Sequence, residues 1–177
     1  MRISAGTVQK LLAFGLCILL IPCTGALAAD HVFVLDAGHG GEDGGAVAPD
    51  GTREDGINLD IVLRMRDIFL LYGVAPVLTR ETEDIAYPPE ETTVRGRKVW
   101  DQKSRTELVN DTERAVLISV HQNIYPTSSP HGAEVLWAPT EDSEALAVWT
   151  QAQLLLWADS SNKRSAGQIS PDISSRP

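Results

Sequence analysis

Two histidines and one glutamate in this 177-residue sequence are the residue types that hold a catalytic metal ion. His39 stands in the glycine-rich stretch "LDAGHGGEDGG", His121 directly follows the apolar run "AVLISV", and Glu54 precedes an amphipathic segment. Two histidines and one carboxylate with an open fourth position form a typical set of catalytic zinc ligands. The chemistry that such a set predicts is metal-assisted hydrolysis of an amide or an ester.

Each of these three residues also has a simpler interpretation. A lone histidine at the end of a strand is more often structural or solvent-exposed than a metal ligand. A carboxylate such as Glu54 also stabilises the N-terminus of a helix, and Asp55 competes with it for either role. Two histidines at equivalent strand ends nevertheless favour a shared site, because the carboxyl ends of neighbouring parallel strands meet at one edge of a sheet.

The glycine-rich stretch has a further alternative interpretation as a phosphate-binding loop. The letters "GHGGEDGG" do not form G-x-G-x-x-G before a helix, and they lack the ending G-K-[ST]. Glu42 and Asp43 would also repel a phosphate group. The formal charge of -9 argues against a nucleic-acid partner as well, because phosphate contacts need clustered Lys and Arg. We therefore favour a metal site and expect no nucleic acid as a partner.

The elements that must position these residues alternate between strands and helices. Apolar residues recur at three- and four-residue steps in 55–72, which Gly73 ends, and the polar residues 80–103 are typical of a loop or insertion. This alternation predicts an α/β fold, with three α/β/α layers around a mostly parallel, mixed and twisted sheet. We predict strands at 31–36, 74–79, 115–120 and 132–138, and helices at 55–72, 103–111 and 143–157.

The two ends of the chain are predicted to lie outside the catalytic domain, which we expect at residues 30–160. Positive charges precede the apolar run "LLAFGLCILLIP", and "ALAAD" follows it, so residues 1–29 indicate a signal peptide, with an uncleaved anchor as the alternative. Both cysteines lie in this segment, so His, Asp or Glu must hold any metal in the exported domain. We expect a secreted or cell-envelope protein. Residues 161–177, rich in Ser, Pro and charge, predict an irregular tail.

Four motifs resemble the zinc-dependent N-acetylmuramoyl-L-alanine amidase family and occur in that family's order. They are "LDAGHGGEDGGA", "EDGINLDIVLRMRDIFLLYGVAPVLTRETED", "RTELVND" leading to "LISVHQN", and "GAEVLWA". The match runs from about residue 32 to about 157, which is most of the exported chain. The stretches "RGRKVWDQKSRTELVN" and "NKRSAGQIS" look most like the germination-specific amidases of spore-forming bacteria.

The resemblance implies an activity as well as a set of ligands. The family's zinc ligands correspond to His39, Glu54 and His121, the same residues that the spacing selects. The implied reaction is hydrolysis of the amide between N-acetylmuramic acid and L-alanine of peptidoglycan, in spore-cortex maturation or germination. Peptidoglycan lies outside the cytoplasm, in agreement with an export signal. We expect a monomer, with an accessory cell-envelope protein as a further candidate partner.

The main departure from the family's pattern concerns the general base. Family members continue past the equivalent of "GQIS" with a strand whose glutamate acts on the zinc-bound water, and no such segment follows here. We therefore expect a truncated, frameshifted or altered C-terminus without the last strand and helix, and a poor catalyst, since acid–base help is worth about 10²–10⁴-fold. Glu134 is a weak candidate for the base. The alternative functions are a non-catalytic zinc- and peptidoglycan-binding remnant, or a zinc carboxypeptidase-like hydrolase.

Several other residues keep open or ordinary interpretations. Arg80 and Arg105 match recurring family positions, and a role on a substrate carboxylate and a structural ion pair are equally compatible with them. His31 and His131 are expected at the surface. The tryptophans after residue 136 are expected in the core rather than as platforms for sugar rings.

Overall fold

A computed structural model describes residues 31–123, 131–140, 142–159 and 161–169. The predicted signal peptide at 1–29 lies outside the described residues. The chain forms two compact units with a boundary between Asn123 and Ile124, and each unit is described here by itself. Among the described helices, none combines the length and the apolar character needed to cross a membrane.

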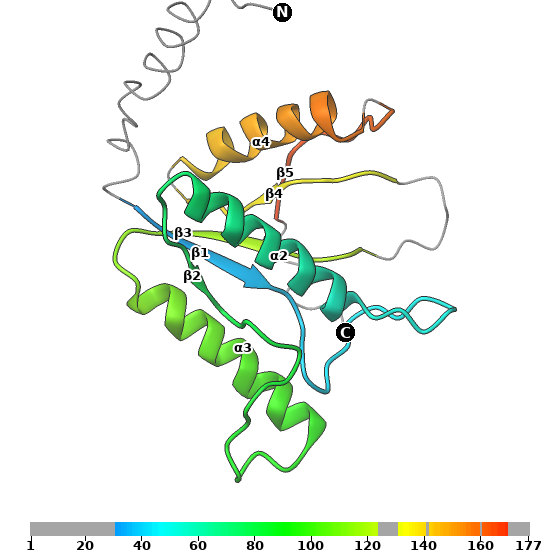
Figure 1. Cartoon of the computed structure of the whole chain (residues 1–177), viewed down its shortest axis with the longest axis vertical. Helices are drawn as coiled ribbons and strands as arrows, with labels where there is room; N and C mark the ends of the chain where they lie inside the picture. The colour runs from blue at the N-terminus through cyan, green and yellow to red at the C-terminus, as the bar shows by residue number, and fades with distance from the viewer. Residues whose placement is uncertain (1–30, 124–130, 141, 160, 170–177) are drawn as a thin grey trace, which may run out of the picture. The chain divides into compact units, whose positions relative to one another are not determined.

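The first unit is built around a parallel sheet. Its elements are β1 (Val32–Ala37), α2 (Glu54–Leu71), β2 (Val77–Leu78), α3 (Val94–Asp111) and β3 (Ala115–Val120). The strand order is β2-β1-β3, so β1 is central and pairs in parallel with both neighbours (Figure 1). The register sets Ala37 beside Val120, and the N–H of Gly38 continues the ladder by donating to the Val120 carbonyl over 3.0 Å. The segments that carry His39 and His121 therefore leave the sheet at the same edge.

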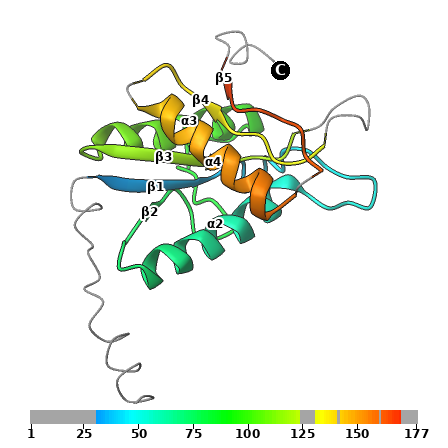
Figure 2. The same cartoon turned by 90° about the horizontal axis from the view of Figure 1, so that it is seen from above.

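The two helices of this unit cover opposite faces of the sheet. Leu35 and Ala37 of β1 are fully buried in the cluster that packs against α2. Asp36 lies between them in sequence and pairs with Arg105 of α3 over 2.9 Å. Because successive side chains of a strand point to opposite faces, α2 and α3 must lie on different sides. In both views β1 runs between the two helices (Figure 1 and Figure 2), which confirms the predicted α/β/α layering.

Helix α3 corrects the prediction of a loop over 80–103. The helix begins at Val94 and includes the short helix predicted at 103–111, so the loop ends at Thr93. None of the described α3 residues is buried, and charged and polar side chains dominate the segment, so its few apolar residues did not indicate a helix before residue 103. The Thr93 Oγ1 accepts a 3.0 Å hydrogen bond from the N–H of Gly96, which caps the helix N-terminus.

The second unit contains β4 (Leu136–Trp137), α4 (Ser143–Trp157) and β5 (Gly167–Gln168). Helix α4 spans the predicted residues 143–157, whereas the strand predicted at 132–138 is reduced to two residues. Gln151 of α4 is buried and ties the helix to the segment before β4, because it accepts from the Val135 N–H over 2.8 Å and donates to the Ala133 carbonyl over 3.1 Å.

Strand β5 corrects the prediction of an irregular tail over 161–177 at residues 167 and 168. It pairs in parallel with β4, and the N–H groups of Gly167 and Ile169 donate to the carbonyls of Val135 and Trp137. The strand has only two residues, Gly167 and Gln168, which is too short for an alternating apolar pattern. The tail beyond Ile169 lies outside the described residues.

The prediction that the late tryptophans belong to the core is wrong for two of them. The side chains of Trp149 and Trp157 on α4 are 64% and 80% exposed, whereas Trp137 is partly buried. Helical spacing alone did not reveal which face of α4 is covered. His31 and His131 are exposed, as predicted.

Candidate metal centre

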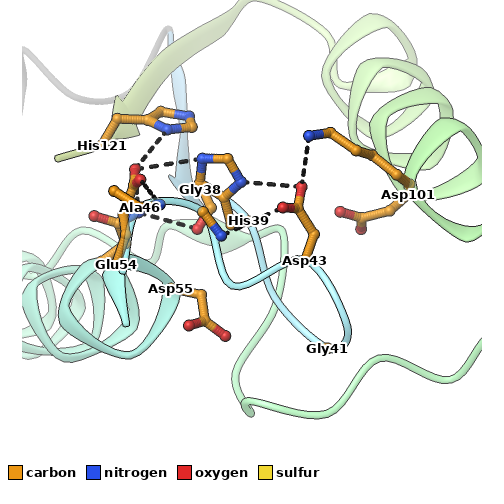
Figure 3. A network of polar contacts seen from close by, with 12 residues as sticks. Gly38, His39, Gly41, Asp43, Ala46, Glu54, Asp55, Asp101 and His121 are labelled. Atoms are coloured by element: carbon orange, nitrogen blue, oxygen red, sulfur yellow. Dashed lines mark hydrogen bonds and ion pairs between the residues drawn. The ribbon is translucent and has the colours of Figure 1, made fainter. Parts of the chain in front are cut away.

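The three predicted metal ligands come together at the edge where β1 and β3 end. The Nε2 of His39 lies 3.4 Å from Glu54 Oε1, and the Nδ1 of His121 lies 3.1 Å from the same oxygen (Figure 3). The two imidazole rings are 4.9 Å apart and nearly perpendicular. One donor atom from each of the three residues lies within 4.8 Å of the others, so the cluster could hold one metal ion.

Glu54 presents a buried, ionised carboxylate to both histidines. Its side chain is only 4% exposed, and its Oε2 accepts from the Ala46 N–H over 2.8 Å. Its Oε1 accepts from the Gln122 N–H over 2.9 Å and from the Asn58 side chain over 3.2 Å. Burial raises the pKa of this carboxyl, but the donors and the nearby His39 outweigh burial and hold the pKa below its ordinary value. The anion is therefore present near neutral pH.

Asp55, which the sequence left as a competitor of Glu54, pairs with the residue before α2 and does not join the cluster. Its carboxylate pairs with Arg53, with 2.9 Å between Nη2 and Oδ2. The same guanidinium donates to the Gly41 carbonyl over 2.7 Å. Asp55 thus fixes the residue that enters α2, and Glu54 is the carboxylate that faces the histidines.

His39 has a left-handed backbone, with φ at 61°. Residues other than glycine rarely adopt this conformation, and its cost is borne only where the surroundings enforce it. Here the Nη2 of Arg105 donates to the His39 carbonyl over 2.5 Å, and Gly40 and Asp43 exchange two backbone hydrogen bonds directly after it. The Nδ1 of His39 lies 3.0 Å from Asp43 Oδ2.

Two arginines hold the loop that carries His39. Arg80 is buried and donates to the carbonyls of Ala37, Gly38 and Asp55 over 3.0, 3.3 and 2.7 Å. Arg105 donates to the Ala37 carbonyl over 2.7 Å. Arg105 also makes the structural ion pairs that the sequence allowed, with Asp36 and Asp101, whereas the hydrogen bonds of Arg80 go to backbone carbonyls. A role of either residue on a substrate carboxylate stays a prediction. Spacing did not identify them as loop supports, because their partners are backbone oxygens.

Asp36 accepts hydrogen bonds from three side chains next to the site. It accepts from Thr79 Oγ1 over 2.8 Å, from Ser119 Oγ over 2.6 Å and from Arg105 Nη1 over 2.9 Å. Burial raises the pKa of the Asp36 carboxyl, but the Ser119 hydroxyl and the Arg105 charge oppose burial and leave the pKa lowered. One carboxylate thus links β1 to β3, to α3 and to the residue after β2.

A cavity of about 460 Å³ opens beside His39 and His121. Its size is within the range of small-molecule sites, and α3 supplies one wall through Gln102 and Thr106. Three aspartates line it, and each has a basic partner: Arg105 pairs with Asp36 and Asp101, and Lys98 pairs with Asp43. Within this described cavity, no aspartate is left without an ion pair.

Glu134 lies in the second unit, where its carboxylate pairs with Arg164. This ion pair gives Glu134 a structural role within that unit. The weak candidacy of Glu134 as a general base stays a prediction.

Replacing Gly38 with alanine is expected to weaken metal binding at this cluster about tenfold or more, because even outer-shell changes cost about 10–100-fold in metal affinity. A Cβ there would overlap the imidazole of His121 and lie 2.6 Å from its Nδ1, so the ring must move. The fold should persist, since the side chain of His121 is 47% exposed and can yield. Competition against a chromogenic chelator measures the affinity, and thermal unfolding measures the stability.

Gly56→Ala is the matched control for this change. A Cβ at Gly56 in α2 meets nothing nearer than an oxygen of Glu83 at 4.0 Å, so metal affinity should stay at the wild-type value. Equal affinities for Gly38→Ala and the unchanged chain would contradict the role given to this close approach.

The chain matches known proteins over most of the described residues. Residues 33–169 match the family described as N-acetylmuramoyl-L-alanine amidase (Amidase_3). The chain is 32% identical over 124 residues to the germination-specific N-acetylmuramoyl-L-alanine amidase of Bacillus subtilis (strain 168), across 70% of this chain and 52% of that protein. It is 34% identical over 122 residues to the N-acetylmuramoyl-L-alanine amidase AmiC of Escherichia coli O6:H1, across 69% of this chain and 26% of that protein.

A solved structure shares the fold. The structure of the CwlD amidase from Clostridioides difficile in complex with the GerS lipoprotein matches with a TM-score of 0.75 and 30% identity. The match covers 80% of this chain and 73% of that chain. Against the two curated relatives above, this chain spans about half of the first and about a quarter of the second.

Proposed function

Because the chain belongs to the N-acetylmuramoyl-L-alanine amidase family, we propose that it uses zinc to hydrolyse the amide between N-acetylmuramic acid and L-alanine in peptidoglycan. The observation that carries this proposal is the convergence of His39, Glu54 and His121 beside a cavity. Two imidazole nitrogens and one buried carboxylate suit zinc, which supplies Lewis-acid polarisation of a carbonyl and activation of water when bound.

The chain's own residues would hold the site in shape for this reaction. Glu54 stays anionic because three donors converge on its oxygens, and it would offset the positive charge of a bound metal ion. Arg80 and Arg105 fix the backbone that presents His39. The wall formed by α3 would keep a bound amide next to the two imidazoles.

A second candidate function is non-catalytic binding of zinc and peptidoglycan. The observation that favours it is the ion pairing of all three aspartates that line the described cavity, since a paired carboxylate is a poor general base. A zinc carboxypeptidase-like hydrolase uses the same kind of ligand set, and the masses of the released products distinguish it.

His39→Ala is expected to abolish the release of stem peptides from purified peptidoglycan by the full chain supplied with zinc. The substitution removes one of the three candidate metal ligands. The control His31→Ala changes an exposed histidine just before β1 and should leave the release of stem peptides unchanged. Mass spectrometry of the soluble products is the measurement.

The products separate the candidate functions. Peptides that begin with L-alanine support the amidase, and fragments cut within the stem support the carboxypeptidase-like reaction. Stoichiometric zinc with no release above the metal-free control supports the binding protein. Unchanged release by His39→Ala would contradict the proposed site.

The proposal extends to the cellular setting. We place the protein outside the cytoplasm, as a secreted or cell-envelope monomer that acts on peptidoglycan in spore-cortex maturation or germination. The name of the Bacillus subtilis relative, a germination-specific amidase, supports the proposed role in germination. The complex of CwlD with the GerS lipoprotein supports an accessory envelope protein as a partner. Cell fractionation tests the location, and size-exclusion chromatography with light scattering tests the monomer.

A further inference from the structure

We propose that Asp43 is a positioning residue of the metal centre, which orients the imidazole of His39 and is itself held by Lys98 of α3. This inference rests on the proposed zinc function, because it concerns how one ligand is presented. It adds a residue outside the ligand set and connects the glycine-rich loop to a helix that provides no ligand.

The geometry assigns the two ring nitrogens of His39 to different tasks. Nδ1 lies 3.0 Å from Asp43 Oδ2, while Nε2 lies 3.4 Å from Glu54 Oε1 (Figure 3). A carboxylate next to Nδ1 favours the tautomer that carries its proton there, which leaves the Nε2 lone pair for a metal. Without Asp43, the ring of His39 loses the contact that selects this tautomer and rotation.

Asp43 is itself held in place from two directions. Its Oδ1 accepts from the Gly45 N–H over 3.3 Å, and the Nζ of Lys98 lies 3.2 Å from its Oδ2. Its side chain is 23% exposed, so water only partly screens these contacts. The neighbouring residue Glu42 pairs with Arg97, so two successive acids of the loop meet two successive basic residues of α3.

A purely structural role for Asp43 makes a different prediction. If Asp43 served only to close the loop through Gly45, its loss would lower the stability of the metal-free chain but leave zinc affinity unchanged. The electronic spectrum of bound cobalt would also stay the same. Metal affinity and cobalt absorption therefore separate positioning from loop closure.

The test uses the metal-free full chain, with Zn²⁺ in competition with a chromogenic chelator and Co²⁺ followed by visible absorption. Asp43→Ala should weaken zinc binding by about 10–100-fold, the usual cost of losing an outer-shell partner, and shift the cobalt bands. Asp43→Asn should show a smaller loss, because its amide oxygen still accepts from Nδ1–H of His39.

Lys98→Met tests the second link, and Lys103→Met is its matched control. We expect a loss of about fivefold or less in zinc affinity for Lys98→Met, the range of a partly exposed ion pair. Lys103 pairs with Glu107 over 3.6 Å on the exposed surface of the same helix, so its replacement should not change zinc affinity.

Wild-type affinity and cobalt bands in Asp43→Ala, with binding lost in His39→Ala, would overturn this inference alone. Failure of the unchanged chain to bind zinc or cobalt would overturn the proposed function and this inference together. If Asp43→Ala does not fold, Asp43→Asn decides, because it keeps the shape of the side chain and removes its charge. Unchanged affinity and spectrum in that variant would then overturn the inference.

Discussion

Replacing Glu54 with glutamine is expected to weaken zinc binding by at least about 100-fold, since outer-shell partners alone cost about 10–100-fold. Glu54 is the only anion of the ligand cluster, and its Oε1 lies within 3.4 Å of a nitrogen of each histidine. A neutral amide removes the charge that offsets the cation and presents an N–H₂ group where an oxygen stood. Calorimetric titration of the metal-free chain with Zn²⁺ measures the loss.

The stability cost of Glu54→Gln should be smaller than its effect on zinc. One N–H donor, such as that of Ala46, loses its acceptor when the amide takes the place of the carboxylate, which costs about 1–3 kcal/mol. Asp55→Asn is the matched control in the same helical turn, because Asp55 pairs with Arg53 and should not affect zinc. Zinc affinity of Glu54→Gln within tenfold of wild type would contradict its assignment as a ligand.

Replacing Asp36 with alanine is expected to lower the free energy of unfolding of the metal-free chain by about 3–5 kcal/mol, the usual cost of removing one partner of a buried ion pair. The change leaves the guanidinium of Arg105 without this carboxylate and takes the shared acceptor from Thr79 and Ser119. Urea unfolding near neutral pH measures the difference. Asp60→Ala breaks an exposed pair with Arg64 and should cost only about 0.3–0.5 kcal/mol.

The pH dependence of the Asp36 effect follows from the direction of its pKa shift. The pKa of Asp36 is lower in the folded chain than its ordinary value, so the carboxylate contributes stability at pH above that ordinary value. This contribution is lost as the pH falls through the lowered folded value. The difference in unfolding free energy between wild type and Asp36→Ala should therefore shrink in acid, and a constant difference from neutral to strongly acidic pH would contradict the assignment.

Side-chain patterns in the sequence were sufficient to locate the elements that carry the ligands. Apolar runs and helical spacing located the central strands and placed α2 and α4 within a residue or two of their observed ends. The parallel arrangement of β1 and β3 then required His39 and His121 to emerge at one edge. The choice between Glu54 and Asp55 needed the structure, because both residues suit the first turn of a helix.

The elements that patterns missed contain few apolar residues or are very short. The first half of α3 has no buried side chain, although its cap at Thr93 is a signal that could have been used. Strand β5 has only two residues, which is too short for an alternating apolar pattern. His39 and Asp43 are four residues apart in an irregular loop. In a helix this spacing predicts a contact between side chains, but in a loop the contact depends on backbone angles that the sequence does not give.

The left-handed backbone of His39 limits how far the proposed metal-binding loop can be transferred to other proteins. The letters "DAGHGG" do not enforce the conformation by themselves, because Arg80 and Arg105 hold the carbonyls around it from distant points in the chain. A graft of the hexapeptide alone into another parallel sheet would relax toward ordinary backbone angles and turn the imidazole elsewhere. The smallest motif that could be grafted is therefore discontinuous in sequence. A design would have to include Arg80 and Arg105 together with the loop.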